Sequence, residues 1–134
     1  WGHDYRELKK AAPHVSIISC QDEYLLVTLL DGCDGALVGF AGFAPELIVN
    51  LVRAALNKDL EGAYAAQEKV RPLAKIIYRF GEPSSNAHHR MKCARWLMGK
   101  FASPVVRRPL RPLPAHEVER VRNELAALGL VTAK

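Results

Sequence analysis

The stretch CQDEYLLVTLLDGCDGALVGFAGFAPELI, residues 20–48, decides the fold of this chain. The residues that lead into it, 15–20, are short and rich in β-branched side chains, which is typical of a buried strand. Residues 23–30 predict a short helix that closes at Asp31-Gly32. Residues 36–40 are apolar on both faces, as in a strand of a parallel sheet. Strand, helix and strand in this order predict a βαβ unit.

The rest of the chain has helical patterns. Residues 4–12 predict the end of a helix that stops at Pro13. After Pro45 apolar residues recur at helical spacing, Asp59 is expected to cap the next helix, and Pro72 should kink that helix. The expected features of the C-terminal part are a helix end at Gly81-Glu82-Pro83, a helix from Ser84 or Ser85 to about Met98, an extended proline-rich connector (SPVVRRPLRPLP, 103–114) and a last helix at 114–128 that stops at Gly129.

Composition places the chain among ordinary globular proteins. It has 134 residues, 49% of them hydrophobic and 25% charged, which fits a single domain. No apolar run approaches the ~18 residues that span a bilayer, and no signal peptide is visible, so we expect a cytoplasmic protein without a membrane partner. Three cysteines, an odd number without framework spacing, favour a reducing compartment.

The start of the chain and the two predicted strands both indicate that part of the fold lies outside this sequence. The chain begins Trp1-Gly2-His3, and removal of an initiating Met does not normally expose a bulky Trp, so we expect a piece of a longer chain. Two strands cannot form a sheet with both faces covered, although both predicted strands are apolar throughout. We therefore expect residues outside this chain, or another chain, to complete the sheet.

The net charge of +5 is unevenly distributed. Residues 67–111 contain eleven Lys and Arg but only Glu68 and Glu82, a local balance of +9. Such asymmetry can mark contact with nucleic acid or with an anionic surface. The more usual explanation of such asymmetry is a solvated face, or basic groups buried against a partner subunit. Few aromatic residues stand near the basic ones for base stacking, so a nucleic-acid partner is not favoured.

One group of residues has the composition of a metal site. His88-His89 is followed by Cys93, and His89 and Cys93 lie four residues apart on one helix face, a spacing that two zinc ligands can use. A third and a fourth ligand are not evident near them in the sequence. We therefore expect these residues to be structural and expect no metal.

Several motifs occur in a specific order. They are CQDEY after the first strand, DG-x-DGALVGFAG-x-AP before the long helix, AAL-x-x-DL-x-x-A, RPL near the kink, RRPLRPL in the connector and LGL at the end of the last helix. In this order they resemble the last barrel units of the dihydrodipicolinate synthase / N-acetylneuraminate lyase family of pyruvate-dependent class I aldolases. The resemblance covers essentially the whole chain, but only the C-terminal part of a family member.

The resemblance implies an α/β fold, the C-terminal portion of a (β/α)8 TIM barrel followed by a helical segment, in a subunit that usually forms a tetramer. The strands at 17–20 and 36–40 would be the seventh and eighth of the barrel. Residues 1–58 would form the last βα units and residues 59–134 the helical segment, so this chain would be mostly helical.

The resemblance also implies site residues. Active sites of such barrels lie at the carboxyl ends of the strands, where Asp22 and Glu23 stand. In the N-acetylneuraminate lyase branch a matching Asp-Glu pair contacts substrate hydroxyls, which implies the same role here. Leu37 matches the position that lines the pyruvate pocket, while Val38 and Gly39 match neighbours that face the distal part of the substrate.

Other interpretations of these residues stay open. Taken alone, Asp22 and Glu23 fit an acidic helix N-terminus, which the helix dipole favours. Gly39 stands where sialic-acid lyases carry a hydroxyl residue, and Cys20 replaces a usual glycine. Neither departure supports sialic acid as the substrate.

The catalytic lysine of the family is expected on the preceding strand, upstream of this chain, so we predict no catalytic residue within it. A Schiff-base lysine must be largely unprotonated near neutrality, which requires a desolvated or cationic pocket. Lys9 and Lys10 fall on a polar helix face, and Lys92 matches a family lysine that does not form the imine.

The sequence thus predicts part of a Schiff-base lyase or synthase, acting at carbon–carbon or carbon–oxygen bonds. Its substrates would be pyruvate or another 2-oxo acid and an aldehyde, with no cofactor and with a homo-oligomer, a tetramer or dimer, as the assembly. The isolated chain is expected to be inactive. Two alternatives are a basic helical binding module for an anionic partner and a non-catalytic half-barrel remnant.

Overall fold

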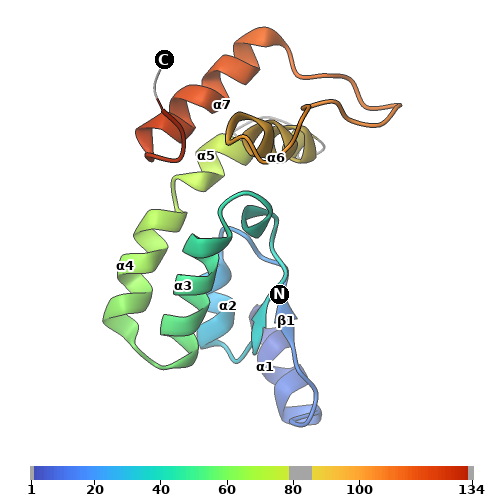
Figure 1. Ribbon diagram of the computed structural model, residues 1–134. Helices are drawn as coiled ribbons and strands as arrows, with labels where there is room; N and C mark the ends of the chain where they lie inside the picture. The colour runs from blue at the N-terminus through green and yellow to red at the C-terminus, as the bar shows by residue number, and fades with distance from the viewer. Residues whose placement is uncertain (1, 79–85, 133–134) are drawn as a thin grey trace. The chain divides into compact units, whose positions relative to one another are not determined.

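The computed structural model describes residues 2–78 and 86–132 (Figure 1). The helix end predicted at 81–83 and the caps predicted at Ser84 or Ser85 lie outside the described residues. The chain divides into two compact units, residues 1–71 and 72–134. The elements of the first unit are α1 (Gly2–Ala11), β1 (Ile18–Ser19), α2 (Leu25–Leu30), β2 (Gly35–Ala36), η1 (Gly39–Gly42), α3 (Pro45–Leu56) and α4 (Leu60–Val70). Those of the second are α5 (Leu73–Ile77), α6 (Ala87–Leu97) and α7 (Ala115–Ala127).

The predicted βαβ unit is confirmed. β1 and β2 pair in parallel, with Ile18 opposite Gly35 and Ser19 opposite Ala36. The ladder continues beyond the second strand, where the backbone N–H of Leu37 donates to the Ser19 carbonyl at 2.8 Å. α2 connects the strands and contacts β1, since the Thr28 hydroxyl donates to the Ser19 hydroxyl at 2.7 Å.

The predicted strand bounds are wrong, and burial on both faces of the strands is not reached within this chain. Both strands are shorter than 15–20 and 36–40: β1 is limited to the two residues that pair with β2, and Gly39 and Phe40 belong to the 3-10 helix η1. Ser19 is fully buried beneath α2, but Ile18 is 45% exposed and Leu37 74% exposed. The physical reason is that, among the described residues, the sheet has two strands and α2 covers one of its faces.

Helices α3 and α4 are joined by a short loop, pack against each other and contact α2 of the βαβ unit. Pro45 occupies the first turn of α3, where its missing N–H costs nothing. The predicted apolar stripe of α3 is confirmed, with Ile48, Leu51 and Ala55 buried. Asp59 caps α4 as predicted, because its side chain accepts a 2.9 Å hydrogen bond from the Gly62 N–H.

The second unit consists of three helices and the connector. A kink of one helix was predicted at Pro72; the structure has a break there, since α4 ends at Val70 and α5 begins at Leu73. α7 packs against α5 and α6, and it ends just before Gly129, whose φ of 68° is the left-handed conformation that glycine favours. Among the described residues of this unit, the large side chains that are fully buried include Leu73, Ile76, Ile77, Arg90, Val121 and Leu125.

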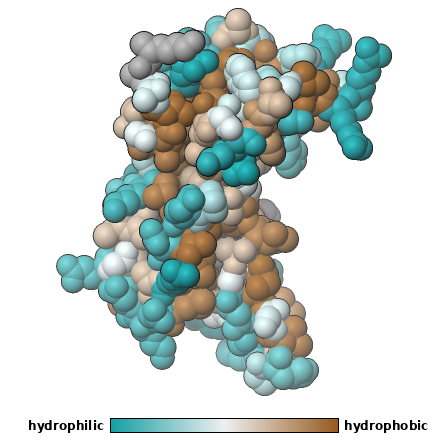
Figure 2. Space-filling model, in the orientation of Figure 1, coloured by the Kyte–Doolittle hydropathy of each residue, from teal (hydrophilic) through white to brown (hydrophobic). Residues whose placement is uncertain are grey.

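Apolar side chains are also exposed. Figure 2 shows brown, hydrophobic residues among hydrophilic ones at the surface of the first unit. Those most exposed there are Leu8, Val15, Ile18, Tyr24, Val27, Leu30, Leu37, Val49, Leu56, Leu60 and Tyr64. Groups of such residues are typical of surfaces that contact other protein. No helix of the described residues is long and apolar enough to cross a membrane.

Candidate active site

The predicted site residues lie at one edge of the sheet. Asp22 and Glu23 follow the carboxyl end of β1, and residues 37–39 follow the carboxyl end of β2. Because the two strands are parallel, these loops emerge at the same edge. This edge carries the active site in TIM-barrel enzymes.

A hydrogen bond joins the two loops. The Oδ1 atom of Asp22, which is half-buried, accepts a bond of 2.7 Å from the backbone N–H of Phe40. The Phe40 side chain is fully buried and meets the Phe43 ring edge-on, with ring centroids 6.3 Å apart. The sequence brings Asp22 to this edge, but no local pattern predicts a partner eighteen residues further along the chain. The predicted substrate contact of Asp22 stays a prediction.

The other predicted site residues differ in exposure. Leu37 is 74% exposed, Val38 is buried at 7% and Gly39 is half-buried at the start of η1. Glu23 is exposed, and no hydrogen bond links it to another described residue. The structure therefore presents an apolar side chain, Leu37, and an acidic one, Glu23, at the sheet edge.

An ion pair lies at the opposite edge of the sheet, where the amino-terminal ends of β1 and β2 stand. The Nζ atom of Lys9 lies 2.7 Å from the Asp34 carboxylate and also donates to the Val15 carbonyl at 3.2 Å. The backbone N–H of Ile17 donates to Asp34 at 2.8 Å. The hydrogen bond from Lys9, and after it that from Ile17, lower the pKa of the Asp34 carboxyl below its usual 3.8. Lys9 is thus engaged by Asp34 and by the Val15 carbonyl at the edge away from the candidate site.

The lysines have the surroundings of surface groups. Among the described residues no lysine is buried. Lys10 pairs with the exposed Glu7 at 2.8 Å, and Lys92 is half-buried on α6, in the second unit. A lysine that forms an imine near neutral pH needs a desolvated or cationic pocket. None of the described lysines has such an environment.

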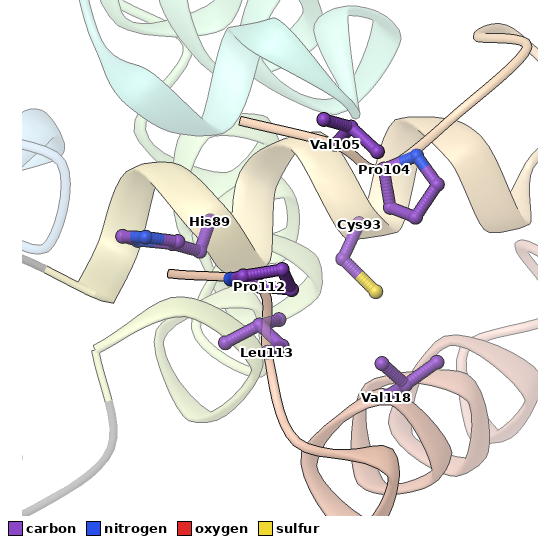
Figure 3. A pocket seen from close by; sticks show the side chains of 7 residues that line it. All are labelled: His89, Cys93, Pro104, Val105, Pro112, Leu113 and Val118. Atoms are coloured by element: carbon purple, nitrogen blue, oxygen red, sulfur yellow. The ribbon is translucent and has the colours of Figure 1, made fainter. Parts of the chain in front are cut away.

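His89 and Cys93 line a small pocket of the second unit (Figure 3). The connector and α7 supply its other walls, which are Pro104, Val105, Pro112, Leu113 and Val118. His89 is 5% exposed, and its Nδ1 atom has no hydrogen-bond partner among the described residues. Burial raises the pKa of the Cys93 thiol to about 11, against an opposite effect of the Arg122 guanidinium.

The chemistry of this pocket does not favour a metal ion. A thiol must lose its proton to bind one, and burial opposes that loss at Cys93. His88 is exposed rather than buried beside His89. Over residues 2–78 and 86–132, no three or more His, Cys, Asp or Glu side chains are grouped to hold a metal ion.

The basic residues of 67–111 lie in different environments, some buried and some exposed. Arg90 is 1% exposed and its Nε lies 3.3 Å from Glu117, so it belongs to the core of the second unit. Arg71 pairs with Glu68 at 3.1 Å, and the Arg95 guanidinium lies 5.3 Å from the centre of the Phe101 ring. Arg107, Arg108 and Arg111 of the connector are exposed. The local charge is therefore divided between a buried ion pair and separate surface groups.

Comparison with known proteins identifies relatives of the chain. Residues 4–128 match the model of the "Dihydrodipicolinate synthetase family". The chain is 39% identical over 125 residues to the probable 2-dehydro-3-deoxy-D-pentonate aldolase YjhH of Escherichia coli K12, covering 92% of this chain and 40% of that protein. It is 30% identical over 123 residues to the putative 2-dehydro-3-deoxy-D-gluconate aldolase YagE of the same bacterium, covering 92% of this chain and 39% of that protein.

Solved structures show the same relationship. Dihydrodipicolinate synthase from Bacteroides thetaiotaomicron matches 92% of this chain and 42% of its own, with a TM-score of 0.82 and 28% identity. The crystal structure of E. coli YagE in complex with pyruvate matches 97% of this chain and 44% of its own, with a TM-score of 0.81 and 27% identity. The chain spans about two fifths of the length of the curated relatives it matches. By sequence and by fold it belongs to the dihydrodipicolinate synthetase family and corresponds to a portion of the TIM barrel and helical segment of that family.

Proposed function

We propose that this chain is part of a Schiff-base lyase or synthase that forms or cleaves a bond beside the imine of pyruvate or another 2-oxo acid. The observation that carries the proposal is the meeting of Asp22 and residues 37–39 at the carboxyl edge of parallel strands, the active-site edge of such barrels. Two relatives are named as aldolases of 2-dehydro-3-deoxy sugar acids, and one was solved with pyruvate, which supports a 2-oxo acid and an aldehyde as substrates.

Each predicted site residue has a role in this proposal. Leu37, exposed on the uncovered face of the sheet, forms an apolar wall beside the 2-oxo acid. Val38 and Gly39 border the distal part of the substrate. The carboxylates of Asp22 and Glu23 stand at the same edge, where hydroxyl groups of an aldehyde or sugar acid would find hydrogen-bond acceptors.

The imine-forming lysine, in this proposal, lies outside residues 1–134. Lys9 is engaged by Asp34 at the opposite edge of the sheet, and the other described lysines are not buried. When such a lysine forms an imine, the protonated imine accepts the electrons of the bond broken beside it. Residues 1–134 alone are therefore expected to be inactive.

The remaining features of the proposal concern organisation. We propose that the enzyme is cytoplasmic and forms a homo-oligomer, either a tetramer or a dimer. We also propose that the boundary between the barrel and the helical segment lies between residues 58 and 59. The exposed apolar side chains of the first unit are consistent with contact surfaces for the rest of a barrel or for other subunits.

Reductive trapping tests the proposal. The chain alone, and a chimera in which it replaces the matching segment of E. coli YjhH, are treated with pyruvate and borohydride and weighed by intact mass spectrometry. We expect no adduct on the chain and one adduct on the chimera. An adduct on the chain would place the lysine within it. A folded chimera without adduct, beside labelled YjhH, would contradict the proposed function.

The basic binding module predicts a different result. A protein that binds nucleic acid through many Lys and Arg loses affinity steeply as salt increases. Arg90 is buried against Glu117 and Arg71 is paired with Glu68, so these two of the basic residues are not free to bind an anionic partner. We expect no salt-dependent binding to duplex or single-stranded DNA in a fluorescence anisotropy titration, and such binding would favour the module.

A further inference from the structure

His89 is buried in the second unit, yet its ring is not fully hydrogen-bonded. The residue is 5% exposed, and its Nδ1 atom has no hydrogen-bond partner among the described residues. A buried polar atom without a partner is uncommon, because it loses hydrogen bonds to water and gains none in return. His88, the neighbouring histidine of α6, is exposed and keeps its contact with water. The burial of His89 thus points to a group that pairs with its ring in the pocket that it lines.

The pocket is built from three segments of the second unit (Figure 3). His89 and Cys93 lie four residues apart, which places them on one face of α6. The connector adds two stretches, Pro104-Val105 and Pro112-Leu113, and α7 adds Val118. The prolines have no N–H to donate, and the valine and leucine side chains are purely apolar. Among the described residues, the lining side chains therefore offer His89 no partner apart from the weakly bonding thiol.

The charges around the pocket favour a neutral ligand. None of the described residues that line the pocket has a charged side chain. The Arg122 guanidinium, whose charge reaches Cys93, lies 3.6 Å from the Glu119 carboxylate and is balanced by it. A charged molecule would lose its hydration in the pocket without gaining an opposite charge.

The size of the pocket sets the size of its ligand. The volume of about 60 Å³ has room for about four to six water-sized groups, since each needs roughly 10–15 Å³. A buried water also needs about two to four polar partners. The side chains here offer only the His89 ring and the Cys93 thiol, so waters are poorly held. An apolar body, in contrast, matches the proline, valine and leucine walls.

We propose that this pocket binds a small neutral molecule with an apolar body of roughly three to five carbons and one hydroxyl group that hydrogen-bonds to His89. A hydroxyl both donates and accepts, so it matches either tautomer of the imidazole. The apolar body contacts the connector and Val118. The ligand thereby joins α6, the connector and α7. The inference is independent of the proposed function, which concerns residues of the first unit.

A titration of the ¹⁵N-labelled chain with butan-1-ol tests the proposal by nuclear magnetic resonance. The backbone amide signals of Cys93, Val105 and Val118 should shift and reach saturation, with a Kd of about 1–10 mM for a ligand of this size. The ring nitrogens of His89 should shift as well, and those of His88 should not. Butyrate, which has the same chain length but is charged at neutral pH, should leave these signals unchanged.

Variants test the role of each wall. His89→Phe keeps a flat ring without nitrogens and should raise the Kd about fivefold, because one hydrogen bond is lost. His88→Phe is the matched control on the same helix and should leave the Kd unchanged. Val118→Phe fills the pocket and should abolish saturable binding. If Val118→Phe does not fold, Val105→Phe takes its place, since Val105 is 63% exposed and tolerates a larger side chain.

Three results would overturn the proposal. They are the absence of saturable shifts at the pocket amides, an unchanged Kd in His89→Phe, and butyrate binding as tight as that of butan-1-ol. Saturable shifts that persist in the pocket-filling variant would place the alcohol elsewhere on the chain, which also contradicts the proposal. Pyruvate trapping in the chimera measures the proposed function separately, so the failure of one is not the failure of the other.

Discussion

Replacement of Glu117 should strongly destabilise the second unit. Its Oε2 atom lies 3.3 Å from Nε of Arg90 and 3.4 Å from Nη2 of Arg120. The side chains of Arg90 and Glu117 are only 1% and 8% exposed. Arg90 also donates to the Ile77 carbonyl at 2.9 Å, and Arg120 to that of Lys75 at 2.8 Å. One carboxylate thus balances two guanidinium groups that tie α6 and α7 to α5.

The size of the effect follows from burial. Glu117→Gln keeps the shape of the side chain and one acceptor oxygen but removes the charge. Arg90 stays buried and charged, because a guanidinium does not lose its proton in proteins. Breaking a buried ion pair on one side costs about 3–5 kcal/mol. Since Gln retains an acceptor and Arg120 is partly exposed, we expect about 3 kcal/mol, a large part of the ~5–15 kcal/mol that stabilises a typical domain.

Urea unfolding followed by far-UV circular dichroism and by tryptophan fluorescence measures this loss. Glu119→Gln is the matched control on the same helix, because Glu119 is 63% exposed and lies 3.6 Å from Arg122. An exposed pair of this kind contributes less than about 1 kcal/mol. Equal and small losses in the two variants would refute the reasoning, since they would show that the Arg90–Glu117 pair does not hold the helices together.

Three further predictions concern the pH, the cysteines and the site. The hydrogen bond from Lys9 lowers the pKa of the Asp34 carboxyl in the folded chain. The stabilisation by ionised Asp34 is therefore complete above the usual pKa of 3.8 and is lost as the pH falls through the lower folded value. Asp34→Asn should flatten the pH dependence of the unfolding free energy in that range, as urea titrations at several acidic pH values would show. Because burial raises the pKa of Cys93 to about 11, iodoacetamide should label the exposed Cys20 in the folded chain and Cys93 only in urea, as mass spectrometry of the peptides would show. Leu37 is 74% exposed, so Leu37→Ala should change the unfolding free energy by less than about 0.5 kcal/mol yet weaken pyruvate trapping in the chimera.

Local patterns predict the helices of this chain well. Asp59 caps α4, Pro72 separates α4 from α5, and Gly129 follows α7 in the left-handed conformation, all as expected. These residues act through their own backbone or through N–H groups within one turn. Their effects therefore need no knowledge of distant parts of the chain.

The strands were predicted less accurately because their neighbours are not local. The β-branched run before Cys20 correctly indicates a strand, and its parallel partner was expected. Burial on both faces is not reached within the described residues, where Ile18 and Leu37 are exposed, and the expectation that other residues complete the sheet stays a prediction. A strand's hydrogen bonds and burial depend on segments remote in sequence, so composition predicts the strand but not its surroundings.

The sequence by itself determined the family, the order of strands and helices, and the sheet edge at which Asp22, Glu23 and residues 37–39 stand. The order of the motifs and the strand–helix–strand pattern, which implies parallel strands, can both be read from the sequence alone. The tertiary structure alone decided that Asp22 binds the Phe40 N–H, that Lys9 is engaged at the opposite edge, and that Arg90 is buried against Glu117. Each of these contacts joins residues at least eighteen positions apart. Such contacts form only when packing brings distant segments together, and no local periodicity encodes them.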